Sequence, residues 1–206
     1  LDTNTTAHDN TAVGSYALTA NTSGTQNTAM GIQAMRFGTT GDYNTALGAF
    51  TLGASDVNTG DHNIAIGRKS MFDNTSGHSN TAVGSSALEN NTTGNQNTAI
   101  GHNAMFTNVG AGHYNVAVGA CALCSNTTGD CNVAVGMYAL GDNTTAQYNI
   151  AIGICAQRDT TTGQYNVAVG GLAMCDNTTG TQNVAIGLNA MNKNTDAGDN
   201  VAVGAN

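Results

Sequence analysis

Residues 80–96 read NTAVGSSALENNTTGNQ, and the same seventeen-residue pattern recurs through the whole 206-residue chain. Its most regular part, Asn-[Thr/Val/Ile]-Ala-[Val/Ile/Leu/Met]-Gly, occurs twelve times. Nine of the eleven intervals between copies are seventeen residues long, one is eighteen and one is nineteen. A short fixed period indicates one structural unit stacked on itself rather than a globular fold around a single pocket.

We number the positions of the unit 1 to 17, starting from the asparagine. Asn at position 1, Ala at position 3 and Gly at position 5 occur in all twelve copies, and position 9 is Leu or Met in ten of eleven. Extra residues fall near 54–57 and 109–111, after position 9. Because loops accept insertions more readily than packed elements, we expect the second half of the unit to face solvent.

The pattern predicts an all-β fold. β-Branched residues dominate position 4, and seventeen residues are too few for two packed helices. We therefore expect a parallel β-roll or β-solenoid of about twelve rungs, with two short strands per rung at positions 1–4 and 7–10. The Gly at position 5 should supply a bend, and Asn-Thr-Thr-Gly should turn the chain with its Gly at positive φ.

Residues 1–206 form a single array with anchors from Asn10 to Asn200. Neither end carries a recognisable cap, and solenoids need polar caps, so we expect a piece of a longer fibre protein. In such a stack the position 1 asparagines should form a hydrogen-bonded structural ladder. They are Asn10, Asn27, Asn44, Asn63, Asn80, Asn97, Asn115, Asn132, Asn149, Asn166, Asn183 and Asn200.

The alanine column predicts self-association. Positions 3 and 4 point to opposite faces of a strand, and a strand that is apolar on both faces is usually covered on both. With position 4 filling the interior, the position 3 alanines become the candidate oligomer seam; alternatively, a monomeric solenoid with a narrow interior demands them. They are Ala12, Ala29, Ala46, Ala65, Ala82, Ala99, Ala117, Ala134, Ala151, Ala168, Ala185 and Ala202.

The composition excludes several classes of function. The net charge is -8 and the five Lys and Arg residues form no stripe, so nucleic-acid binding is not expected. The apolar runs are too short for membrane insertion in this segment. No catalytic constellation, metal site or cofactor motif stands out, and we expect no enzyme activity, no metal and no cofactor.

The five cysteines replace variable positions, so the fold does not need them. Cys124 and Cys131 flank an Asn-Thr-Thr-Gly turn, and a disulfide could join them across it. Cys121-x-x-Cys124 lacks the second pair of ligands that a zinc site requires. Asn-x-Ser/Thr sequons, such as that at Asn91, are either glycan acceptors or simply good turns.

The motifs Ala-Val-Gly-x-x-Ala-Leu and Ala-Ile-Gly-x-x-Ala-Met resemble the head repeats of trimeric autotransporter adhesins. The longer form, Asn-Thr-Ala-Val-Gly-x-x-Ala-Leu-x-x-Asn-Thr-Thr-Gly, is similar to repeat regions of phage tail fibres and bacterial surface fibres. The resemblance covers the whole chain and implies a trimeric parallel β-roll that serves attachment. Autotransporter heads usually have shorter repeats, and this chain shows no neck, coiled-coil stalk or membrane anchor.

The expected function is therefore a structural and adhesive fibre segment, extracellular, on a cell surface or a virion. Its expected partners are further copies of itself, in a homotrimer, and a host-surface or glycan receptor. One alternative is a carbohydrate-binding solenoid, because Tyr43, Tyr114, Tyr148 and Tyr165 each precede an anchor asparagine. A less favoured alternative is an ice-binding solenoid, since the two Thr of Asn-Thr-Thr-Gly are adjacent and would point oppositely in a strand.

Overall fold

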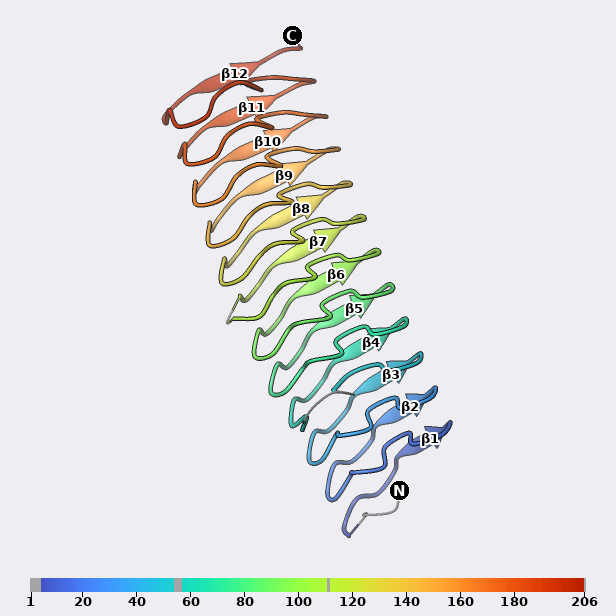
Figure 1. Ribbon diagram of the computed structural model, residues 1–206. Coiled ribbons are helices and arrows are strands. Elements are labelled where there is room, and N and C mark those ends of the chain that lie inside the picture. Colours follow the sequence, from blue (N-terminus) through green and yellow to red (C-terminus); the bar gives the residue numbers. More distant parts are fainter. Residues whose placement is uncertain (1–4, 54–56, 111, 206) are drawn as a thin grey trace.

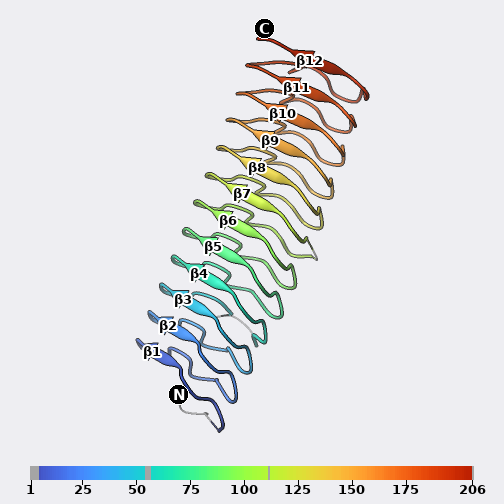
Figure 2. The same cartoon turned by 180° about the vertical axis from the view of Figure 1, so that it is seen from behind.

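The computed structural model describes residues 5–53, 57–110 and 112–205. Twelve three-residue strands stack in chain order into one parallel sheet, and each is followed by a return path without regular strand structure (Figures 1 and 2). The strands are β1 (Thr11–Val13), β2 (Thr28–Met30), β3 (Thr45–Leu47), β4 (Ile64–Ile66), β5 (Thr81–Val83), β6 (Thr98–Ile100), β7 (Val116–Val118), β8 (Val133–Val135), β9 (Ile150–Ile152), β10 (Val167–Val169), β11 (Val184–Ile186) and β12 (Val201–Val203). We call each repeat a rung and number it by its strand.

Equivalent residues of successive rungs lie side by side, as in the pairs Ala117↔Ala134 and Val118↔Val135. The predicted all-β parallel solenoid is therefore confirmed. The two ends of the chain lie at opposite ends of an elongated rod (Figure 1). At about 4.8 Å per strand, the eleven steps from β1 to β12 span about 53 Å.

The prediction of a second strand at positions 7–10 is wrong, because each rung has only the strand that follows its position 1 asparagine. Positions 7 and 9 take left-handed backbone angles in every described rung, as at Ser86 (φ 58°) and Leu88 (φ 51°). The segment is still bonded along the axis, because Ser86 N–H donates to Arg68 O of the preceding rung at 2.9 Å and Leu88 N–H donates to Ala104 O of the following rung at 3.0 Å. These bonds offset the steric cost of left-handed angles at residues other than glycine.

The two glycine positions serve different purposes. Position 5 has positive φ throughout, as at Gly136 (φ 130°), where an added Cβ would lie 2.5 Å from Gly153 O. The position 15 glycines do not have the expected positive φ. At Gly94 a Cβ would instead lie 2.4 Å from Asn91 Oδ1 and 2.5 Å from Asn108 Nδ2, so glycine is needed there for space.

The interior of the stack is filled by alanine at position 3 and, in most rungs, by alanine at position 8 and Leu or Met at position 9; Thr51, Ser70 and Gln157 are buried exceptions. This corrects the expected oligomer seam: the position 3 alanines of rungs 2 to 11 are fully buried within the single chain and cannot contact a partner. They are Ala29, Ala46, Ala65, Ala82, Ala99, Ala117, Ala134, Ala151, Ala168 and Ala185, and only Ala12 and Ala202 of the end rungs are open. Position 9 fills the narrow interior, so the strand can contribute only a methyl group.

The inserted residues interrupt the stack little. Residues 54–56 and 111, which fall within the two inserted regions, lie outside the described residues. Around the first insertion, Gly38 and Asn58 keep a parallel bridge between rungs 2 and 3. Among the described residues there is no helix with the length and apolar character needed to cross a membrane.

Candidate functional surface

All twelve position 1 asparagines lie in one column on the inner side of the sheet edge. At each of the eleven steps, the backbone N–H of one asparagine donates to Oδ1 of the preceding one at 2.8–3.0 Å. In rungs 1 to 11 the Nδ2 group donates across the rung to the carbonyl at position 15, as from Asn132 to Ala146 at 2.8 Å. The column therefore ties neighbouring rungs together and closes each rung on itself.

The position 12 asparagines form a second ladder, which the sequence did not predict. Asn91 Nδ2 donates to Asn74 Oδ1 at 2.9 Å, and Asn108 Nδ2 donates to Asn91 Oδ1 at 2.7 Å. Most of the sequon asparagines belong to this ladder and are buried, which removes them as glycan acceptors in the folded chain. Thr160 interrupts the ladder, and its Oγ1 and Asn143 Oδ1 have no hydrogen-bond partner.

The most extensive outer feature is the solvent-facing side of the sheet, formed by positions 2 and 4 of every strand. Position 4 is Val, Ile, Leu or Met, and its side chains point outward; Ile100 and Ile152 are each 41% exposed. Position 2 is Thr in β1–β3, β5 and β6, and Val or Ile in β4 and β7–β12. We call these two columns the sheet face. It contains no charged residue.

The size of the sheet face is set by the stack. Three residues at about 3.3 Å across each strand and about 53 Å along the axis give roughly 500 Å². Ile32, Met137, Ile154 and Leu188 at position 6, just past the glycine bend, are also exposed. Monomeric soluble proteins rarely expose contiguous apolar patches larger than a few hundred Å². The sheet face is about as large as the largest apolar patch on a typical monomer, and patches of that size are often functional.

The anchor-preceding tyrosines lie at position 17 and are about half exposed. Tyr148 and Tyr165, on adjacent rungs, stack with ring centroids 5.1 Å apart and planes 3° apart. Tyr43 stacks in the same way on His62, at 4.9 Å. In each stacked pair one ring face covers another, and the tyrosines stay about half exposed.

The first threonine of Asn-Thr-Thr-Gly, at position 13, does not contribute to the free hydroxyl array that ice binding needs. At position 13 the hydroxyl donates along the axis to the next rung, as from Thr127 to Thr144 O at 2.8 Å and from Thr178 to Thr195 O at 2.9 Å. These hydroxyl protons are used within the solenoid. We do not propose ice binding from this column.

All five cysteines are free thiols, so the disulfide considered between Cys124 and Cys131 is not formed. Burial, more than any neighbouring charge, raises the pKa of Cys175 to about 11. Its thiol is therefore protonated at neutral pH.

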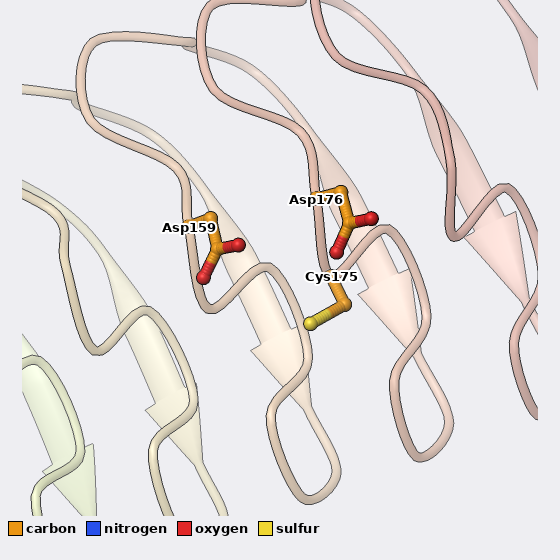
Figure 3. Close-up of side chains that lie close together, drawn as sticks. All are labelled: Asp159, Cys175 and Asp176. Carbon is orange, nitrogen blue, oxygen red and sulfur yellow. The ribbon is translucent and has the colours of Figure 1, made fainter.

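One group in the described chain has the composition of a metal site. Asp159, Cys175 and Asp176 present ligand atoms within 4.8 Å of one another, from adjacent rungs (Figure 3). Each carboxylate already has its own cation, with Arg158 Nε at 2.6 Å from Asp159 and Lys193 Nζ at 2.8 Å from Asp176. Lys193 also holds the pKa of Asp176 below its usual range. With both carboxylates paired and the thiol protonated, the group is poorly suited to bind a cation.

Comparison with protein-family models, with curated proteins and with solved structures gave no match. A function must therefore be inferred from the surfaces of the solenoid themselves. The sheet face runs along the whole array and is free of charged residues.

Proposed function

We propose that this chain is a structural and adhesive fibre segment, a length of shaft or head that assembles with copies of itself and mediates attachment. The observation that carries the proposal is the uncharged, largely apolar sheet face along all twelve rungs. The repeated interior supports it too, since the same few contacts recur in every rung and none is specialised for chemistry.

The rod is suited to hold two points apart. Every rung is joined to the next by the strand ladder and by the position 1 asparagine ladder, and most rungs also by the second asparagine ladder or by threonine hydroxyls such as that of Thr144, which donates to Thr161 O at 3.1 Å. These hydrogen bonds run along the long axis. Such a stack can be lengthened by adding rungs without a new core, as in other solenoids.

The partner we propose for the sheet face is a second copy of the chain. Two faces of roughly 500 Å² each would bury about 1,000 Å², which is the lower bound for a specific interface. Faces without charge leave no ion to desolvate on association. Each copy carries the same β-branched columns at the same rung spacing. When equivalent rungs of two copies lie side by side, their side-chain columns therefore have the same spacing along the axis.

If the copies assemble about an axis parallel to the rod, equivalent rungs of all copies lie at the same height. The two ends of the rod are then not blocked by the assembly. A closed ring of copies about that axis uses the same face of each chain and exposes none of it. The number of copies we propose, three, comes from the resemblance to trimeric adhesin heads and fibre repeats. The seam is then formed by positions 2 and 4, with the alanines inside each chain.

The proposed location is extracellular, on a cell surface or a virion, where such fibres act. The remaining outer surface carries exposed Thr and Tyr side chains and offers hydrogen-bonding and stacking groups to a host-surface or glycan receptor. Attachment is then multivalent, because identical rungs on several copies present the same groups repeatedly.

Light scattering of the full chain tests the assembly. We expect a mass of three chains for the native protein and a shift toward one chain for Ile100→Glu/Ile152→Glu, which places carboxylates in the sheet face. Thr162→Glu, at an exposed position away from that face, is the matched control and should stay trimeric. Circular dichroism should show that all variants keep the fold. A native protein that is monomeric at micromolar concentration contradicts the proposal.

The second candidate function, carbohydrate binding, is favoured by the exposed Tyr148–Tyr165 stack, since aromatic faces pack well against sugar rings. A glycan array probed with the native chain and with Tyr148→Ala/Tyr165→Ala tests it. Binding that disappears in the variant supports a receptor site on this column. Equal signals from both proteins, or none from either, argue against it.

A further inference from the structure

Four of the five cysteines lie on one lateral strip of the rod, in rungs 7 to 10. Cys121 and Cys155 occupy position 7, and Cys124 and Cys175 occupy position 10. Cys131 lies apart, at position 17. Only rung 7 has cysteine at both positions.

Positions 7 and 10 are the first and last residues of a tight turn. The position 10 N–H donates to the position 7 carbonyl in rungs 8, 9 and 10, from Gly141 to Tyr138 at 3.2 Å, and at 3.3 Å in the two rungs that follow. A turn of this kind holds its end Cα atoms within about 7 Å. Disulfides need a Cα separation of about 4.4–6.8 Å.

The backbone of rung 7 resembles that of rung 8, although the closing bond from the Cys124 N–H to the Cys121 carbonyl does not form there. Cys121 and Tyr138, at the equivalent position 7, have φ of 54° and 56°. Leu123 N–H donates to Ala139 O at 2.9 Å, and Ser125 N–H donates to the carbonyl of Gly141 at 3.0 Å, so the backbone is in register on both sides of Cys124. The two cysteines of rung 7 therefore stand at the two ends of this turn.

The two side chains lie close enough to influence each other, because the neighbouring Cys121 raises the pKa of Cys124 and that of Tyr138 in the next rung. Burial, followed by the neighbouring Cys121, raises the pKa of Cys124 to about 11. Both thiols are partly accessible to solvent.

We propose that Cys121 and Cys124 form a redox-active dithiol, which a small-molecule disulfide oxidises to a disulfide across the turn of rung 7. The thiolate of Cys121 attacks one sulfur of the small disulfide, forms a mixed disulfide and releases one thiolate. Cys124 then loses its proton and attacks the Cys121 sulfur, which forms the protein disulfide and expels the second thiolate. Two protein thiols are oxidised, and one small disulfide is reduced to two thiols.

The pairing is specific to rung 7. In rung 9 the turn partner of Cys155 is Arg158, and in rung 10 the turn partner of Cys175 is Leu172. The remaining thiols therefore have no turn partner with which to form the same bond. The inference does not depend on how the chains assemble or on what the fibre binds.

Oxidised glutathione is the probe, applied to the full chain carrying Cys131→Ser, Cys155→Ser and Cys175→Ser. After oxidation, free thiols are labelled with a maleimide and the intact mass is measured. We expect the mass to fall by two hydrogens and the label count to drop from two to none, with both labels regained after reduction. The native chain should fall from five labels to three.

The matched control adds Cys124→Ser, so that Cys121 alone remains. It should stop at a stable mixed disulfide with glutathione, which shows that Cys121 is accessible. The proposal is overturned if the two-cysteine variant accumulates glutathione adducts instead of losing two hydrogens. It is equally overturned if neither variant reacts while circular dichroism shows that both are folded.

Discussion

The asparagine ladder makes a quantitative prediction at Asn166, a fully buried member of the column. Asn166 Oδ1 accepts the backbone N–H of Asn183 at 3.0 Å, and its Nδ2 donates to Gly180 O at 2.8 Å. In Asn166→Ala the Asn183 N–H loses its acceptor inside the solenoid, which costs about 1–3 kcal/mol. Gly180 O keeps the Nδ2 of Asn177 at 3.0 Å, so the second lost bond costs only about 0.5–1.5 kcal/mol.

The expected loss of unfolding free energy is therefore about 1.5–4.5 kcal/mol, the sum of those two costs. Asn200→Ala is the matched control: it makes the same change in the same column, but at an exposed end rung, where surface changes cost about 0.5 kcal/mol or less. Urea unfolding followed by circular dichroism, at one fixed protein concentration because assembly shifts stability, measures both. Equal midpoints for the two variants would refute the view that the ladder stabilises the stack.

Three further predictions follow from the interior and from one thiol. Gly136→Ala should destabilise the fold by several kcal/mol in urea unfolding, because the φ of Gly136 is 130° and an added Cβ would have no room. Gly171→Ala is the control and should be tolerated, because only one side-chain atom would lie within 4 Å of the added Cβ. Leu140→Ala should lower the unfolding free energy by about 2–5 kcal/mol and Met137→Ala, which is exposed, by much less, as thermal melts of both should show. Burial raises the pKa of Cys175 to about 11, so its alkylation by iodoacetamide at pH 8 should be about 100-fold slower than that of a cysteine with an ordinary pKa. The rate should rise toward pH 11, and a pH-rate profile checks this.

The strand of each rung was predictable because its signal is local. Asn-x-Ala-x-Gly places β-branched residues beside a residue that can take positive φ, and the fixed period brings equivalent strands into register. The Gly at position 5 is a reliable bend for the same reason, as Gly136 shows. The asparagine column follows from the period alone, since stacked amides are natural hydrogen-bond partners.

The return path was not predictable because its backbone contradicts residue preferences. Leu88 and Tyr138 take left-handed angles that such residues normally avoid, and only hydrogen bonds to the rungs above and below hold them there. Turning Leu88 inward also decides the direction of the strand. With that side chain in the thin interior, Ala82 is the only strand residue that fits beside it, and Val83 must point outward. The usual rule that large apolar residues face inward therefore placed the position 4 side chains in the interior, whereas they lie on the outer face of the sheet.

That reversal separates what the fold requires from what it leaves open. Positions 1, 3, 5, 9, 12 and 15 are constrained by the interior, whereas positions 2 and 4 are free to vary and yet stay uncharged in all twelve strands. Position 2 changes from mostly Thr in β1–β6 to only Val or Ile in β7–β12. An apolar side chain gains more free energy on burial than a hydroxyl-bearing one of the same shape. If the sheet face joins copies of the chain, β7–β12 contribute more of the association free energy than β1–β6, and charges introduced there should separate the copies more readily.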